Sequence, residues 1–418
     1  MFQTLLAASF AAFPCAQDPS AAPRPTADGP ARLEQLEKRL ADLERQHSTE
    51  VEELRAELER LEQEAARARS KPPPQSASVF NPGITVFGNF LARTDDRPVF
   101  VDDDPSAERV DDRFLLREFE LDFRAAIDPW ADGVLIAAFG AETPGDFSAE
   151  VEEGYVLLKK LPLLDTAPAG LKLKVGRFRP ALGRLNTIHL HDLPQPSYPR
   201  AVQTMLGAEG FVADGVAGQF FLPSPGADDV LEAHLALLDG GNLPIAGGQS
   251  ASQLGKLARV QWFRDLAPGK DLAVGVSAWT SDTDHALYGL DATYRWKPAV
   301  AGEWRSFLVG LEAFQAELDD PALASSPAAF DVWSQVQLER NLYLGGRFDR
   351  AEDLADERLV THTLGLYLTY YTTEFLRFRV GYEHTESDLD HLDGLDTGLF
   401  ELNFVYGSHP TEPYWVNR

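Results

Sequence analysis

Hydrophobic and polar residues alternate along short segments between residues 84 and 407. In residues 118–127, 288–297, 376–383 and 400–406, apolar or aromatic side chains occupy every second position. A period of two predicts β-strands with one apolar face. We count sixteen such segments, which begin near Ile84, Phe114, Gly133, Val151, Gly170, Phe211, Val230, Leu257, Leu272, His285, Phe307, Phe330, Leu342, Leu359, Phe375 and Gly398.

Segment length and aromatic placement favour a membrane barrel over a soluble sandwich, which would also alternate. The segments run for about ten residues, as tilted membrane strands do. Aromatic residues lie near their ends, as in interfacial girdles, at Trp130, Tyr288, Trp296, Trp304, Tyr370 and Phe375. After the N-terminus, no apolar run reaches the roughly 18–20 residues of a membrane helix. We therefore expect an all-β membrane protein: a 16-stranded antiparallel transmembrane β-barrel over residues 84–407.

The connections alternate in length. Short turns are expected at Asp128–Asp132, Leu266–Lys270, Glu339–Asn341 and Thr372–Glu374, and the connections between them are longer. Short periplasmic turns and long external loops are typical of bacterial barrels. This parity places both ends of the barrel on the periplasmic side.

Residues 31–70 have a different pattern, with leucines spaced alternately by three and four and no Gly or Pro. The spacing predicts an α-helical coiled coil with one four-residue stutter at His47–Val51. Oligomerisation would bury the leucine stripe. The alternative is a single charged helix stabilised by i,i+4 pairs.

The remaining segments are short. Residues 1–16 resemble a signal peptide, although they lack Lys and Arg before the apolar run, and Cys15 leaves lipidation as an alternative. Residues 17–30 and the Pro-rich residues 71–83 are expected to be linkers, and 408–418 a periplasmic tail. The coiled coil would then lie in the periplasm of a bacterium with an outer membrane.

Charge and composition exclude several functions. A net charge of -27 argues against a nucleic-acid partner. The single cysteine allows no disulfide within the chain and no cysteine-based metal site. No nucleophile-elbow, zinc-protease or phosphate-loop motif is present. We expect no enzyme activity and no cofactor.

Within the predicted barrel, the polar side of the strands carries both charges. Opposed acidic and basic walls would create a transverse field in a water-filled lumen. The alternative is a set of salt bridges that brace the lumen. The residues expected to face the lumen are Glu118, Glu120, Asp122, Arg124, Asp291, Arg295, Arg347, Asp349, Arg377, Arg379 and Glu383.

The longest connection, from Arg179 to Met205, is the third on the external side. Residues 175–184 (VGRFRPALGR), His189, His191, Pro194, Pro199 and residues 206–210 resemble the phosphate-selective porin (porin O and P) family and its outer-membrane relatives, some of them zinc-regulated, TonB-dependent receptors. The resemblance implies a 16-stranded, trimeric porin with an external loop folded into the lumen. The chain departs from phosphate-binding members in having only nine lysines.

Candidate constriction residues lie in and next to this connection: Arg177, Arg179, Arg184, His189, His191 and Arg200. Arginine suits anion recognition, but the parity of Leu171, Leu173 and Val175 would point Arg177 and Arg179 outward. The arginines could therefore line the pore, lie at its rim or pair with nearby carboxylates. His189 and His191, with Asp192, could bind Zn²⁺; the alternative is hydrogen bonding within a loop.

The expected function is passive diffusion of small hydrophilic or charged solutes, filtered at the third external loop. The alternative is a structural barrel whose coiled coil tethers the outer membrane to the cell wall. A gated receptor is less favoured, because residues 17–83 are too short and too helical for a folded plug. Expected partners are outer-membrane lipid, two further copies of the chain, the cell wall and small solutes or ions.

Overall fold

The computed structural model describes residues 34, 37–42, 45, 82–101, 105–143, 146–161, 167–240, 243–246, 254–282, 285–298, 303–319 and 326–407. The chain divides into two units, Met1–Val79 and Phe80–Arg418. In the first unit, the described residues of the expected coiled coil are helical. Several predicted segments lie outside the described residues, and the expectations for them stay predictions: the rest of that coil, the signal peptide, residues 17–30, most of residues 71–83 and the tail 408–418.

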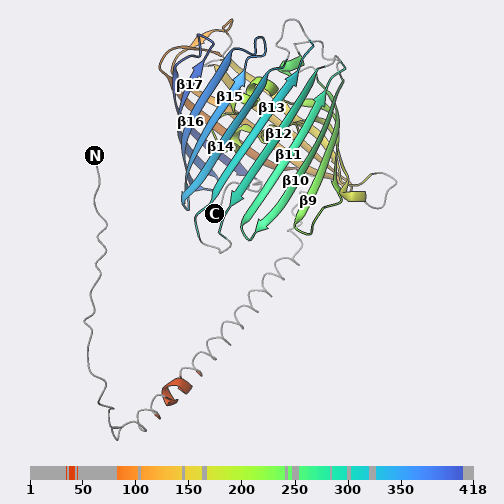
Figure 1. Cartoon of the computed structure of the whole chain (residues 1–418), viewed down its shortest axis with the longest axis vertical. Coiled ribbons are helices and arrows are strands. Elements are labelled where there is room, and N and C mark those ends of the chain that lie inside the picture. The colour runs from red at the N-terminus through yellow and green to blue at the C-terminus, as the bar shows by residue number, and fades with distance from the viewer. Residues whose placement is uncertain are drawn as a thin grey trace, which may run out of the picture. The chain divides into compact units, whose positions relative to one another are not determined.

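The second unit is a closed barrel of sixteen antiparallel strands (Figure 1). Each strand pairs with its neighbour in sequence, and the first closes on the last through the register Thr85↔Gly407. The predicted 16-stranded antiparallel barrel is confirmed. Its strands are β1 (Gly83–Asp95), β4 (Arg113–Asp128), β5 (Ala131–Thr143), β6 (Asp146–Leu158), β7 (Lys172–Phe178), β8 (Ala213–Leu222), β9 (Asp229–Asp239), β10 (Leu254–Ala267), β11 (Lys270–Thr280), β12 (Ala286–Trp296), β13 (Phe307–Glu317), β14 (Ala328–Glu339), β15 (Leu342–Glu352), β16 (Val360–Thr373), β17 (Leu376–Ser387) and β18 (Leu395–Gly407).

Alternation sorts the side chains between the two faces of the barrel. On β16, Leu364, Leu366 and Leu368 are exposed on the outer face, whereas Thr363 and Tyr367, which lie at alternate positions, are buried. Closure pairs the strand edges, so the backbone groups of the wall need no water. The result is an apolar outer surface around a polar interior, as a lipid environment requires.

The predicted division into a short-turn end and a long-loop end holds in part. A two-residue connection also joins β5 (ending at Thr143) to β6 (beginning at Asp146) at the long-loop end, and a long connection separates β6 (ending at Leu158) from β7 (beginning at Lys172) at the short-turn end. Two-residue turns join β4 to β5, β10 to β11, β14 to β15 and β16 to β17 at the end where β1 begins. At the opposite end, the connection from β1 to β4 contains a small sheet of β2 (Val99–Phe100) and β3 (Arg109–Val110). Among the described residues, no helix has the length and hydropathy needed to cross a bilayer.

One glycine shows how large interior side chains are accommodated. A Cβ at Gly310 on β13 would lie 2.3 Å from Cε2 of Trp333 on β14. The indole therefore lies flat against the neighbouring strand, where only glycine leaves room. Trp333 is buried inside the barrel by this arrangement.

Candidate functional site

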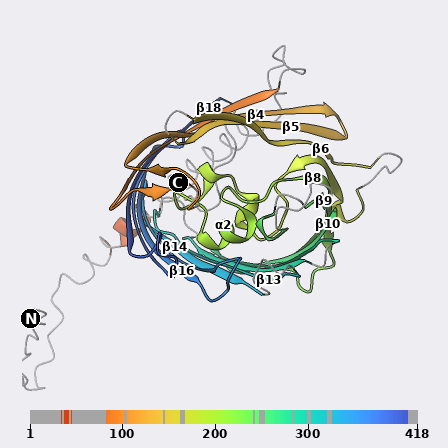
Figure 2. The same ribbon diagram turned by 90° about the horizontal axis from the view of Figure 1, so that it is seen from above.

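Residues 179–212, which join β7 to β8, form what we call the inward segment. Its helix α2 (Arg200–Leu206) lies within the ring of strands when the barrel is seen from above (Figure 2). Two 3-10 turns, η3 (Leu185–Thr187) and η4 (Leu190–Asp192), precede the helix. The segment contacts strands β13, β14 and β15 through α2, and strand β1 through η4. It therefore crosses the interior from one wall to the other.

One side of the inward segment packs against an apolar part of the wall, which we call the apolar region. Leu182, Leu185, Val202, Met205 and Leu206 of the segment are almost completely buried there. The wall contributes small and aromatic side chains from β9 to β15, namely Ala236, Leu238, Leu257, Trp279, Leu287, Leu308, Phe314, Ala316, Ala329, Trp333 and Ala351. This packing fixes the inward segment against these strands.

The other side of the inward segment meets arginines of the wall, which donate hydrogen bonds to its backbone carbonyls. Arg377 donates to the carbonyl of His191 at 2.9 Å, and Arg379 donates to that of Leu193 at 2.9 Å. Arg347 donates to Ser197 at 2.8 Å, and Arg117 donates to Pro196. We call the wall residues of β1, β4, β6, β15, β17 and β18 that contact the segment with polar groups the charged region.

Glu401 on β18 is the centre of this arginine group. Its two carboxylate oxygens accept hydrogen bonds from Arg377 at 2.8 Å and from Arg379 at 2.7 Å. Asn89 donates to the same carboxylate at 2.7 Å. All four side chains are buried, so the pairing satisfies charges that could not remain unpaired away from water.

Two β-bulges place further charges inside the barrel. In the pairing of β5 with β6, Ile136 lies opposite Glu153 and Ala137 opposite Val151, so Glu152 is the extra residue. A bulge lets two consecutive side chains point to the same face, and both Glu152 and Glu153 are buried. The pairing of β1 with β4 skips Arg117 in the same way, next to the buried Glu118.

These bulges complete a group of carboxylates and imidazoles that we call the carboxylate–imidazole cluster: Glu118, Glu120, Glu152, Glu153, His189 and His191. The Nδ1 atom of His189 lies 3.0 Å from Oε2 of Glu152 and 3.4 Å from Oε2 of Glu120. The Nδ1 atom of His191 lies 3.4 Å from Oε2 of Glu120 and 3.5 Å from Oε2 of Glu118. The cluster therefore connects the inward segment to β4 and β6.

The environment of both histidines favours a positive charge. Burial by itself lowers the pKa of His191, but the carboxylates of Glu120, Asp192 and Glu118 raise it to about 9. The pKa of His189 is also raised well above its usual value, because nearby glutamates outweigh the effect of burial. Arg179 adds a guanidinium that donates to Glu152 at 3.0 Å.

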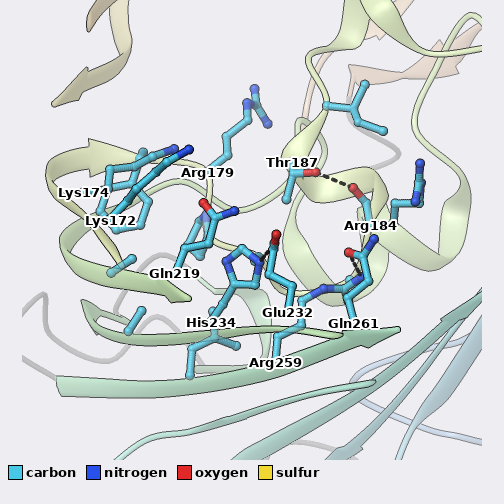
Figure 3. A pocket seen from close by; sticks show the side chains of 18 of the residues that line it. Lys172, Lys174, Arg179, Arg184, Thr187, Gln219, Glu232, His234, Arg259 and Gln261 are labelled. Atoms are coloured by element: carbon cyan, nitrogen blue, oxygen red, sulfur yellow. Dashed lines mark hydrogen bonds and ion pairs between the residues drawn. The ribbon is translucent and has the colours of Figure 1, made fainter. Parts of the chain in front are cut away.

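Cavities lie on both sides of the inward segment. The larger cavity, of about 550 Å³, is lined by residues of β6 to β10 and of the inward segment (Figure 3). Its polar lining includes Lys172, Lys174, Arg179, Arg184, His189, Asp192, Gln219, Glu232, His234, Arg259 and Gln261. Because lysine and arginine outnumber the carboxylates here, this cavity is basic in an otherwise acidic protein.

The second cavity, of about 450 Å³, lies toward the β2–β3 end and includes Arg93, Arg113, Arg200 and Glu383. A third cavity of about 170 Å³ shares Arg179 with the first cavity and Glu209 with the second. We call Arg179, Glu209 and the adjacent Glu152 the narrow passage. Between them, these three residues border all three cavities.

The structure places the constriction candidates in different surroundings. Arg179 is buried and also donates to the carbonyl of Glu209 at 2.6 Å. Arg177 is half-exposed, lies 3.8 Å from Asp214 and borders the small third cavity. Arg184 borders the larger cavity, and the backbone N–H of Arg200 donates to Asp349 at 3.2 Å.

The other charged residues predicted for the lumen occur in pairs. Arg124 pairs with Asp122 at 2.8 Å, Arg295 with Asp271 at 2.8 Å, and Asp291 with Arg259 at 2.5 Å. Arg347 lies between Asp349 and Glu383, at 2.9 and 3.0 Å. At these positions, pairing and contacts with the inward segment account for much of the charge.

Sequence reasoning missed several residues of this site. Lys172 and Lys174 alternate with Leu171, Leu173 and Val175, so strand parity alone could have assigned them to the interior. Glu152, Glu153 and Arg117 could not be found in that way, because a bulge interrupts the parity.

Comparison with known proteins agrees with the fold. OprB of Pseudomonas putida is 10% identical, with 78% of this chain and 94% of that chain covered and a TM-score of 0.53. The outer membrane channel DcaP of Acinetobacter baumannii is 11% identical, covering 78% and 97%, with a TM-score of 0.51. OmpF of Salmonella typhi, in a complex with daunomycin, is 10% identical, covering 77% and 97%, with a TM-score of 0.51. At such identities the likeness shows the fold, which is that of outer-membrane barrels.

Sequence relatives add little. No family model matches the chain, so the resemblance to phosphate-selective porins stays a prediction. An Aquifex aeolicus protein is 32% identical over 112 residues, which are 27% of this chain. The chain spans 21% of the length of that relative.

Proposed function

We propose that this chain is an outer-membrane porin through which small hydrophilic or charged solutes diffuse passively. The observation that carries the proposal is the pair of cavities on opposite sides of the inward segment, within a closed barrel whose outer face is apolar. A barrel with an apolar outside and a charged, hollow inside suits transfer of polar solutes across lipid.

The inward segment would act as the filter. Its apolar side packs against β9 to β15, and a solute would pass through the larger cavity between the segment and β6 to β10. There the narrow passage presents Arg179 between the acidic Glu152 and Glu209. Charged groups at a constriction select solutes by size and by sign. Arginines and lysines of the larger cavity favour solutes that carry an anionic group; inorganic phosphate belongs to that class.

Assembly and attachment to the envelope form the second part of the proposal. The heptad pattern of residues 31–70 favours a homotrimer joined by a periplasmic coiled coil, with a length of roughly 60 Å at 1.5 Å per residue. The same coil could contact the cell wall, which would make the barrel a tether. The two roles are compatible.

Planar-bilayer recordings of the purified full-length chain test the porin. We expect stepwise ion currents that scale with the number of inserted channels. A folded, heat-modifiable protein that inserts without current, but binds cell-wall sacculi, would overturn the porin and favour the tether.

Deletion of residues 31–70 tests the coil separately. We expect the heat-resistant oligomer band on a gel to weaken while the barrel still folds. An unchanged band would contradict the role of the coil in assembly.

A further inference from the structure

We propose that the carboxylate–imidazole cluster is a binding site for a divalent transition metal of the zinc class, which connects the inward segment to β4 and β6. The ligands are Nδ1 of His189 and His191 and one carboxylate oxygen each of Glu118, Glu120 and Glu152. They form two adjoining groups of three, Glu118–Glu120–His191 and Glu120–Glu152–His189, and Glu120 is common to both. The proposal rests on the positions of these side chains inside the barrel and does not depend on solute transport.

In each group of three, the two contacts between the imidazole and the carboxylates are close in length to the edge of a tetrahedron around a metal. With metal–ligand bonds of about 2.0–2.1 Å, the edge of a tetrahedron measures about 3.3–3.4 Å. The four contacts between imidazole Nδ1 and carboxylate Oε2 measure 3.0, 3.4, 3.4 and 3.5 Å. A direct charge-assisted hydrogen bond would be shorter, at about 2.7–2.9 Å. For His191 in particular, both contacts are too long for such a bond.

Four of the five ligand atoms have no hydrogen-bond partner among the described residues, whereas the fifth, Oε2 of Glu152, accepts from Arg179 at 3.0 Å. Within the described residues, Oε2 of Glu118, Oε2 of Glu120 and Nδ1 of both histidines are buried without any hydrogen bond. Glu118, Glu120 and His191 are each more than nine-tenths buried. Buried polar atoms that converge without partners are costly. A divalent cation that displaces the protons of the two imidazoles would satisfy all four atoms.

The surroundings orient the imidazoles as a metal site requires. The Nε2 atom of His189 lies 2.8 Å from Oε1 of Glu153. When Nε2 donates to that carboxylate, Nδ1 keeps the lone pair that a metal needs, as in most histidine–metal sites. The ring of His191 is stacked on Phe87, with centroids 4.0 Å apart.

The larger cavity provides a route to the site. His189, Glu153 and Asp192 border it directly. A hydrated ion can therefore reach the cluster from the open interior. Two imidazoles with three carboxylates suit zinc or a neighbouring first-row ion better than calcium, whose ligands are oxygen atoms.

Metal content tests the site. The full-length protein is folded in lipid, treated with chelator, loaded with Zn²⁺, freed of unbound ion and analysed by mass spectrometry. We expect at least one zinc per chain in the wild type and a loss of most of it in the double variant His189→Ala/His191→Ala. His234→Ala is the matched control, because His234 lies in the same cavity beside Glu232 but belongs to neither group of three.

A conservative variant and an absorption spectrum distinguish loss of metal binding from loss of folding. Glu118→Gln keeps the shape of the side chain and removes the negative ligand, so we expect weaker zinc binding by a barrel that remains heat-modifiable. Bound Co²⁺ should give the visible absorption of a tetrahedral nitrogen–oxygen site in the wild type. Equal zinc in wild type and double variant, or no zinc in a folded wild type, would overturn the proposal. Bilayer currents from the same samples report on the porin separately.

Discussion

The apolar and charged regions hold the same inward segment by different means. In the apolar region, Leu182, Val202, Met205 and Leu206 are buried against side chains that require no particular orientation. In the charged region, each contact joins a named donor to a named acceptor, such as Arg379 to the carbonyl of Leu193. Hydrophobic burial is non-directional, whereas buried hydrogen bonds depend on geometry.

The difference shows how one interior can be both stable and open. Apolar packing excludes water and fixes the segment against half of the wall. The charged region supplies polar groups, such as Glu153 and Glu152 of β6, that border the larger and the small cavity. Its arginines and carboxylates neutralise one another and at the same time position the segment. Apolar packing and buried charge pairs therefore act on opposite faces of one loop.

The largest effect is expected in the charged region, from Glu401→Ala. The change leaves Arg377 and Arg379 buried without their common carboxylate. Breaking a buried ion pair on one side costs about 3–5 kcal/mol. Urea unfolding in detergent micelles would measure the loss, with Glu401→Gln as the milder control. Equal stability of wild type and Glu401→Ala would show that the arginine group does not hold the segment.

Met205→Ala tests the apolar region. The side chain is completely buried in α2, and shortening it removes apolar contacts and leaves a cavity. We expect a loss of about 2–5 kcal/mol in the free energy of unfolding. Limited proteolysis should also cut the inward segment faster. Greater protection of the segment in the variant would contradict the apolar anchor.

Arg179→Gln should change selectivity in addition to stability, because Arg179 is buried and paired with Glu152. The variant removes the positive charge between Glu152 and Glu209, so the passage should favour cations. We expect the cation-to-anion permeability ratio to rise by about two- to tenfold, or about 0.4–1.4 kcal/mol. Reversal potentials in a salt gradient measure the ratio. Arg264→Gln is the control, since Arg264 is half-exposed on β10 and pairs with Asp229. An equal rise of the permeability ratio in this control would contradict a special role of Arg179 in selectivity.

The smallest effect is expected for an exposed pair outside both regions. Lys256 and Asp282 lie 2.9 Å apart, and each side chain is more than half exposed. Lys256→Ala should change the free energy of unfolding by less than about 1 kcal/mol. Urea unfolding in detergent micelles measures this change in the free energy of unfolding. A loss comparable with that of Glu401→Ala would mean that burial does not separate the two kinds of pair.

Much of the wall was predictable from residue order. The sixteen predicted strand starts fall within five residues of the observed ones, and all four predicted short turns are present. Parity also assigned Glu118, Glu120 and Asp122 to one face, and these residues are buried together. The role of the candidate residues in a filter remains a prediction.

The order of residues is enough to predict the period of two, and through it the strands, the two faces and the closed barrel. Which charges meet depends on the folded chain. Glu401 reaches Asn89 across 312 positions, and His189 reaches Glu153 across 36. The bulges at Glu152 and Arg117 shift the inward–outward alternation by one residue, and no local sequence pattern predicts them. Alternation is a local property of the chain, whereas the surroundings of a loop inside a barrel depend on every strand that encloses it.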